Sequence, residues 1–182
     1  MKYKLVVLSI TVILISVCGN SCKKHHSDNN GLPPATQTGA NTLGFLLNGQ
    51  VWMPKGFNGS TTNLSVSVDE GYKNGTFNIT AYRILSDSNR QYMALGIADS
   101  LNFQPIPVTL RIGKQSLFGL SFITNKCTYD FFDTSIYRDG QLILSKFDKA
   151  NQIISGTFNV ILFKSDCGDT VKITNGRFDM HF

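Results

Sequence analysis

Residues 64–68, Leu-Ser-Val-Ser-Val, alternate strictly between apolar and polar side chains. In an extended chain this alternation places the apolar side chains on one face and the serines on the other, which is typical of a half-buried β-strand. The same two-residue period returns in residues 106–112 and 157–162. No window of the chain shows convincing spacing of an amphipathic helix. The sequence therefore predicts an all-β domain.

Asn-Gly and Asp-Gly pairs separate several of these runs. Such pairs accept the positive φ that a tight type I′ turn requires at both central positions. We expect hairpin turns at Asn48-Gly49, Asp139-Gly140 and Asn175-Gly176, and a turn at Asn74-Gly75. The predicted strands are 43–48, 50–53, 63–69, 76–84, 91–98, 106–112, 117–124, 127–132, 135–138, 141–147, 153–163 and 170–182. Roughly ten short antiparallel strands, mostly joined locally, indicate an antiparallel β-sandwich or a closed β-meander.

The first 21 residues have the pattern of an export signal. A short basic start precedes residues 5–17 (LVVLSITVILISV), which are almost wholly apolar. This stretch is shorter than the roughly 20 residues of a membrane-spanning helix and fits the about 7–15 of a secretory signal. A cysteine follows small residues, which resembles the lipobox of bacterial lipoproteins. The preferred lipid-attachment site is Cys22, after the small Ser21, and the alternative is Cys18, after the bulkier Val17.

Residues 23–41 (KKHHSDNNGLPPATQTGAN) have no apolar periodicity and consist largely of polar residues, glycine and proline. Such a composition is typical of a flexible linker. We interpret His25 and His26 on this segment as polar spacer rather than as metal ligands. The predicted organisation is a lipoprotein signal peptide at 1–21, a lipidated cysteine with a flexible tether at 22–41, and one β domain at 42–182.

Composition and charge narrow the class of protein. The chain has 182 residues, of which 42% are hydrophobic and 16% charged, and its formal net charge is +5. This length fits one domain, and the low charge argues against disorder. Apolar residues lie in short runs, which excludes a polytopic membrane protein. Removal of residues 1–21 takes away two lysines and leaves +3, without the arginine-rich stripe of a nucleic-acid binder.

Two cysteines lie inside the predicted β domain, Cys127 and Cys167, 40 positions apart. Exported proteins fold in oxidising compartments, so an even pair favours a disulfide. In the chain-entropy model a loop of this size contributes about 4 kcal/mol at most. The spacing alone also allows two buried thiols.

The β domain is poor in catalytic groups. Its histidine, His181, lies one residue from the C-terminus, and Asp130, Asp133, Asp166 and Asp169 flank short turns. We interpret these aspartates as solvated turn residues, because nothing in the sequence selects a pair at glycosidase spacing or an EF-hand. Zinc-site spacing and phosphate-binding loops are also missing. We therefore expect no enzyme, no cofactor and no metal site.

Aromatic side chains are the remaining candidates for ligand contact. We single out Trp52 and Tyr82, because Tyr82 shares its strand face with Asn78 and Thr80 and is expected to point outward. Several rings on one exposed face would offer stacking platforms for sugars. The alternative is that they cover the rim of the core. The chain's tryptophan and tyrosines considered for this role are Trp52, Tyr72, Tyr82, Tyr92, Tyr129 and Tyr137.

Two segments carry a resemblance to a known family. Residues 32–52 (LPPATQTGANTLGFLLNGQVW) and the tail, ISGTFN at 154–159 with TVKITNGRFD at 170–179, resemble exported Bacteroidota lipoproteins with one β-rich domain of unknown function. The resemblance covers almost the whole mature chain. It implies a lipid anchor in the outer membrane of the cell envelope, with the domain facing the periplasm or the cell surface. It carries no activity, substrate or site residue.

Three functions follow from the sequence. The favoured one is a non-catalytic, membrane-anchored domain that binds a glycan, a lipid or an envelope protein; the alternative is a purely structural or assembly component of the envelope. An aspartate-based hydrolase ranks third. Outward aromatic rings beside a groove would favour a glycan, a closed barrel with an apolar cavity would favour a lipid, and two carboxyl groups facing each other in a cleft would favour the hydrolase. A polar exterior with one flat apolar patch would favour the structural component.

Overall fold

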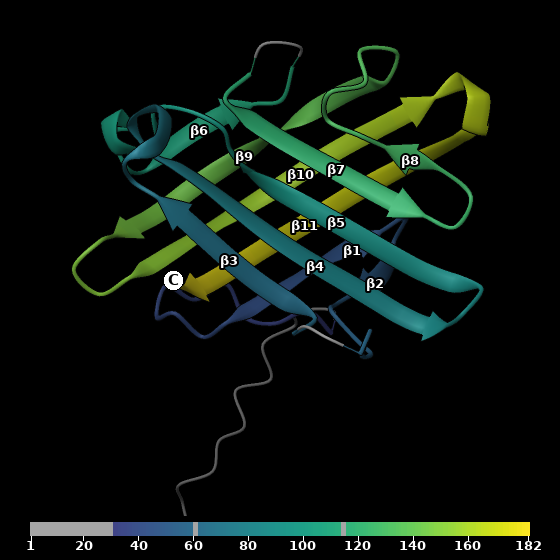
Figure 1. Ribbon diagram of the computed structural model, residues 1–182, viewed down its shortest axis with the longest axis horizontal. Coiled ribbons are helices and arrows are strands. Elements are labelled where there is room, and N and C mark those ends of the chain that lie inside the picture. The colour runs from purple at the N-terminus through teal and green to yellow at the C-terminus, as the bar shows by residue number, and fades with distance from the viewer. Residues whose placement is uncertain (1–30, 60–61, 114–115) are drawn as a thin grey trace, which may run out of the picture.

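A computed structural model describes residues 31–59, 62–113 and 116–182. The predicted signal peptide, Cys18, Cys22, His25 and His26 lie outside the described residues. The described chain forms eleven strands in two antiparallel sheets, which pack as a sandwich and do not close into a barrel (Figure 1). Of the two predicted architectures, the sandwich is confirmed. Within the described part, no helix is both long and apolar enough to cross a membrane.

The two sheets have six and five strands, and the strands of one sheet cross those of the other in Figure 1. In order, the six-stranded sheet contains β2 (Gln50–Trp52), β1 (Thr42–Leu47), β11 (Asp169–His181), β10 (Ile153–Lys164), β9 (Tyr137–Asp148) and β6 (Val108–Arg111). The five-stranded sheet contains β3 (Leu64–Asp69), β4 (Thr76–Ser86), β5 (Asn89–Ile97), β7 (Phe118–Thr124) and β8 (Thr128–Tyr129). Three short 3₁₀ turns connect strands, η1 (Tyr72–Asn74), η2 (Leu101–Phe103) and η3 (Ser165–Cys167).

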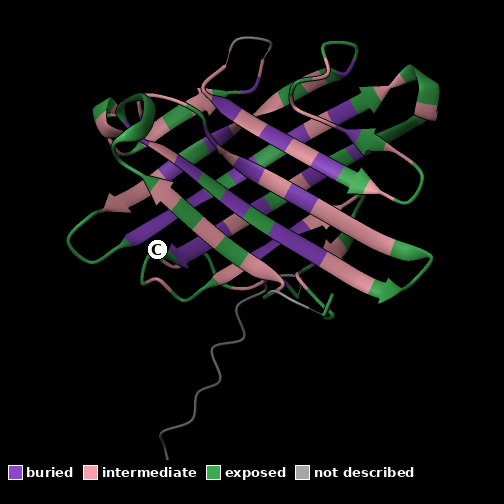
Figure 2. Cartoon of the chain, viewed as in Figure 1, coloured by how far each residue is buried: buried purple, intermediate pink, exposed green. Residues whose placement is uncertain are grey.

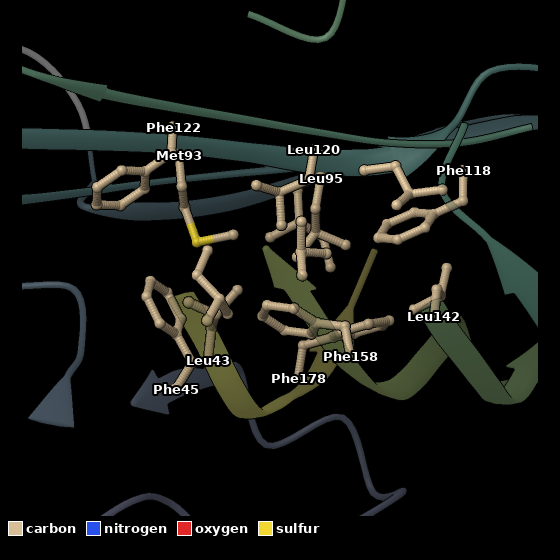
Figure 3. Packing of buried hydrophobic residues seen from close by; sticks show 14 of the residues in the cluster. Leu43, Phe45, Met93, Leu95, Phe118, Leu120, Phe122, Leu142, Phe158 and Phe178 are labelled. Carbon is tan, nitrogen blue, oxygen red and sulfur yellow. The ribbon is translucent and has the colours of Figure 1, made fainter. Parts of the chain in front are cut away.

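The core lies between the sheets and follows from the two-residue period. Figure 2 shows buried residues alternating with less buried ones along most strands, and Figure 3 shows side chains of both sheets meeting in the middle. Full burial of one large apolar side chain contributes about 1.5–3 kcal/mol. Phe45 of β1 stacks on Trp52 of β2 with ring centroids 4.6 Å apart, and both rings are fully buried.

Two of the four predicted turns are correct. Asn48 and Gly49 both have positive φ, 49° and 84°, between β1 and β2, and Asn74-Gly75 turns the chain before β4. The hairpins predicted at Asp139-Gly140 and Asn175-Gly176 are wrong, because these pairs lie inside β9 and β11. The predicted strands 135–138 and 141–147 are accordingly parts of one strand, β9.

Gly140 and Gly176, where the predicted hairpins are wrong, occupy positions where a neighbouring strand approaches closely. A side chain at Gly140 would collide with the carbonyl oxygen of Asn159 in the neighbouring strand β10. A Cβ at Gly176 would lie 2.6 Å from the ring of Phe158, and the β10–β11 register shifts next to this pair. Glycine in a strand marks bulges and close approaches as well as turns, so an Asn-Gly or Asp-Gly pair alone does not distinguish a hairpin from a close approach between strands.

Part of the predicted tether is fixed to the domain. Leu32 is buried, and residues 36–40 hold the carboxylate of Asp179 in β11, which is only 1% exposed. The donors are Thr36 Oγ1 (2.6 Å), Thr38 N (2.9 Å), Thr38 Oγ1 (3.2 Å), Gly39 N (2.8 Å), Ala40 N (3.3 Å) and Ser155 Oγ (2.7 Å). Residues 32–40 therefore differ from the predicted flexible segment. A buried carboxylate more than a hundred positions away pairs with their polar groups, and the local composition gives no sign of it.

Burial alone would raise the pKa of Asp179. Hydrogen bonds from Thr36 Oγ1, Thr38 N, Ser155 Oγ and Gly39 N outweigh burial and hold the pKa well below its ordinary value. The carboxylate is therefore ionised, and its charge is satisfied by donors rather than by a cation.

The predicted disulfide between Cys127 and Cys167 is present, with the two Cα atoms 5.9 Å apart. Cys127 lies between β7 and β8 of the five-stranded sheet, and Cys167 lies in η3 between β10 and β11 of the other sheet. The bond therefore joins the two layers of the sandwich.

Candidate functional site

The outer face of the five-stranded sheet is lined by unusually small side chains. Every second residue of its strands points away from the core, and outward residues of neighbouring strands lie directly opposite one another. Two adjacent rows result. The first row is Ser65, Thr80, Ala94 and Ser121, and the second is Ser67, Asn78, Gly96 and Gly119. Taller side chains stand beyond both rows, so the middle of this face is low.

Two hollows lie over these rows, with volumes of about 600 Å³ and about 410 Å³. Both hollows are lined by Ala94 and Ser121, so they are continuous. We call the combined surface the outer trough. The sheet that carries it lies in front in Figure 1, where β4, β5 and β7 run across the middle of the view.

One end of the outer trough is closed by two tyrosines. Tyr82 of β4 and Tyr92 of β5 are register partners, with ring centroids 6.1 Å apart and ring planes 50° apart. Ile123 of β7 is the register partner of Tyr92 and is 36% exposed. Tyr82 lies on the outward face of its strand, although its neighbours leave it only 6% exposed.

Trp52 does not contribute to this surface. Its ring is fully buried against Phe45, and its Nε1 donates a hydrogen bond to Gln91 Oε1 at 2.7 Å. The prediction of Trp52 as a ligand-contact residue is therefore contradicted. A strand of three residues is too short for its alternation to show which face is buried, and pairing of β2 with β1 turns this ring inward.

The other end of the outer trough carries three further aromatic rings. The Phe131 ring lies against Gly119, where a Cβ would be 2.9 Å from it, and its backbone N–H donates to Ser121 Oγ at 2.9 Å. Phe132 is 83% exposed and its ring centroid is 5.3 Å from that of Phe131. Tyr72 in η1 is 57% exposed and lines the same hollow.

Arg138 of β9 fixes the loop that presents Phe131 and Phe132. Its guanidinium donates hydrogen bonds to the backbone carbonyl oxygens of Phe131 and Asp133 and lies 5.5 Å from the centroid of the Phe131 ring. The Asp133 carboxylate in turn pairs with Lys164 Nζ at 2.9 Å. Hydrogen bonds from Ser135 and Lys164 lower the pKa of Asp133, so it stays ionised. The Phe131 ring and the backbone of its loop are therefore held in place before a ligand arrives.

The floor of the outer trough combines hydroxyl and amide groups with a larger apolar surface, and its middle carries no charged side chain among the described residues. The described residues that line the larger hollow include no Asp, Glu, Lys or Arg, whereas hydroxyl groups stand in the middle, such as those of Ser65 and Thr80, 2.7 Å apart. Asp69 and Lys73 stand at the far end of the smaller hollow. The Asp69 carboxylate accepts hydrogen bonds from the backbone N–H groups of Gly71 and Tyr72, both at 3.0 Å.

The four turn aspartates each accept a hydrogen bond within their own turn. The donors are Phe132 N for Asp130, Ser135 N for Asp133, Ser165 Oγ for Asp166 and Thr170 N for Asp169. His181 is exposed, and its backbone N–H donates a hydrogen bond to Asn41 Oδ1. Within residues 31–59, 62–113 and 116–182, no three His, Cys, Asp or Glu side chains gather to form a metal site.

The sequence identifies tyrosines at both ends of the outer trough but not the two phenylalanines. Tyr82, Tyr92 and Tyr72 are among the aromatic candidates of the sequence analysis, and Phe131 and Phe132 are not. The missed signal is the run of small outward residues in consecutive strands, which only strand register brings together. Comparison of the chain with protein-family models, with curated proteins and with solved structures finds no match. The site is therefore assigned from its own geometry.

Proposed function

We propose that this protein is a non-catalytic binding protein and that its outer trough holds an uncharged glycan. The observation that carries the proposal is the pairing of a low floor of hydroxyl and amide side chains with aromatic rings at both ends. A sugar ring presents apolar C–H groups on its faces and hydroxyl groups around its edge. Aromatic rings suit the faces, and side chains that both donate and accept hydrogen bonds suit the edge.

The same features disfavour the other ligands considered. The sandwich is open, so it does not enclose the apolar cavity that a lipid would need. A phosphorylated or acidic ligand would gain little over the larger hollow, whose described lining residues include no cation, and Lys73 in the smaller hollow stands beside the opposite charge of Asp69. The outer face is hollowed and aromatic rather than flat, which favours a ligand site over a purely structural contact surface.

We further propose that the domain is exported and anchored to the cell envelope through a lipid on Cys22, or on Cys18. The apolar leader and the cysteine after it support this placement. The Cys127–Cys167 disulfide supports an oxidising compartment. The intact mass of the protein purified from bacterial membranes tests the anchor, because cleavage and acylation at Cys22 or Cys18 give different masses.

A glycan array probed with the full chain tests the binding function. Two tyrosines give a matched pair of variants: Tyr92→Ala removes a ring from the outer trough, and Tyr137→Ala removes a 59% exposed ring from the other sheet. We expect binding to neutral saccharides that Tyr92→Ala weakens and Tyr137→Ala leaves unchanged. Absence of any saccharide signal, or equal loss in both variants, would overturn the proposed function.

A further inference from the structure

We infer that the outer trough takes a linear, uncharged oligosaccharide of several units rather than a single sugar; this rests on the proposed glycan function. The first argument is length. Along β4, the row that contains Tyr82 is four residues from the row that contains Asn78, which corresponds to about 13 Å at about 3.3 Å per residue. The Phe131 ring lies against Gly119 in the row of Asn78, and Tyr72 and Phe132 line the same hollow as Asn78. One sugar ring therefore cannot contact the aromatic side chains of both ends.

The second argument is continuity. The two hollows share Ala94 and Ser121, and Gly96 and Gly119 lie next to these residues in the neighbouring row. Neither glycine adds a side chain between the hollows: the backbone of β4 lies against Gly96, and the Phe131 ring lies against Gly119. A chain of sugar units that follows β4 and β5 would place its units over both rows, with an aromatic ring at either end.

The third argument is charge. A bound chain would pass over Ser65, Thr80 and Ser121, which are neutral, before it reaches Asp69 and Lys73 at one end. These two residues have opposite charges, and the Asp69 carboxylate is already engaged by backbone N–H groups. Repeated carboxylates along the ligand would lose hydration over these neutral side chains, and only a unit at one end could meet Lys73. The ligand class is therefore a neutral linear oligosaccharide.

Titration calorimetry with oligosaccharide ladders tests the inference. The probes are β-1,4-linked glucose, α-1,4-linked glucose, β-1,4-linked mannose and β-1,4-linked xylose of one to six units, with α-1,4-linked galacturonate as the charged comparison. We expect at least one neutral ladder to bind with an affinity that rises about tenfold or more from one unit to four and then levels off. Galacturonate of equal length should bind more weakly.

Variants at the two ends of the outer trough show where the oligosaccharide binds. Phe132→Ala removes an 83% exposed ring and leaves the core intact, Tyr92→Ala removes a ring from the opposite end, and Tyr137→Ala is the control. We expect each end variant to weaken the longest ligand several-fold and to move the plateau to a shorter chain. Single sugars should lose affinity in one end variant only.

The outcomes separate this inference from the proposed function. Neutral binding that is equal for one unit and six, or that is insensitive to Phe132→Ala, would overturn the inference and leave glycan binding in place. Tighter binding of galacturonate than of every neutral ladder would overturn the neutral class. No binding of any ladder at millimolar concentration would overturn the inference and the proposed function together.

Discussion

Replacement of Asp179 by alanine should destabilise the domain by about 3–5 kcal/mol, because several donors lose their common acceptor and each buried donor left unsatisfied costs about 1–3 kcal/mol. The carboxylate is 1% exposed and accepts hydrogen bonds from Thr36, Thr38, Gly39, Ala40 and Ser155. Hydrogen bonds to charged groups contribute about 1.5–3 kcal/mol each, but those on one carboxylate are not additive. Loss of 3–5 kcal/mol is a large part of a typical domain stability of about 5–15 kcal/mol.

Asp179→Asn is the graded companion to this change. The amide keeps the size of the carboxylate and one oxygen acceptor, but its NH₂ group faces N–H and O–H donors. We expect a loss of about 1–3 kcal/mol, smaller than that of Asp179→Ala. Residues 36–40 should also become more accessible to protease in both variants, because their donors lose the common acceptor.

The pH dependence follows from the lowered pKa of Asp179. An unfolded aspartate has a pKa of about 3.9, so the stabilising contribution is fully present well above pH 4 and is lost as the pH falls below it. Asp133 and Asp148 also have lowered pKa values, so the wild-type chain loses stability in acid for several reasons. The difference between wild type and Asp179→Asn isolates this group and should shrink between pH 6 and pH 3.

Urea denaturation at pH 6, 4 and 3 measures these quantities, with the fluorescence of Trp52 as the signal. Trp52 is the chain's one tryptophan and is fully buried in the folded domain. A difference below about 1 kcal/mol between wild type and Asp179→Ala at pH 6 would refute the reasoning, because surface substitutions commonly reach half of that. So would a gap between wild type and Asp179→Asn that stays constant with pH.

Three further predictions concern the layers and the trough. Joint replacement of Cys127 and Cys167 by serine should lower the free energy of unfolding by up to about 4 kcal/mol, measured by urea denaturation, because their 40-residue loop is freed; an unchanged midpoint would contradict this. Gly119→Val should displace Phe131 and weaken glycan binding roughly 3- to 10-fold by calorimetry, the loss of about one aromatic contact; unchanged affinity would show that this ring is not used. Trp52→Phe should lower the melting temperature in calorimetry, because it leaves a cavity and an unpaired Gln91 amide oxygen, and an unchanged value would exclude both effects.

Most of the fold follows from local pattern. The alternation in residues 64–68 predicted β3, and similar patterns placed the other strands within a few residues of their bounds. Periodicity succeeds here because one face of each strand must be buried whatever its partner is. The predictions at Gly140 and Gly176 are wrong because the neighbouring strand decides the role of these glycines. A close approach between strands requires glycine, as a tight turn does.

The outer trough depended on information that a single strand does not carry. Thr80, Ala94 and Ser121 are ordinary outward residues one at a time, and only pairing brings them into one low row. The fixed segment at 36–40 was missed for the same reason, since its acceptor, Asp179, lies at the other end of the chain. The even number of cysteines and the expected oxidising compartment predict the disulfide, but only the fold shows that the Cα atoms of Cys127 and Cys167 lie close enough to form it.

The most direct test of the account is an amide chemical-shift titration of the full chain with the tightest neutral oligosaccharide from the ladders. The account predicts that the largest shifts fall on Thr80, Ala94 and Ser121, with smaller ones toward Tyr72. The amide resonances of residues on the outer face of the six-stranded sheet, such as Asn159, should not shift. Shifts centred on Asn159, or saturable binding without shifts on the five-stranded sheet, would contradict it.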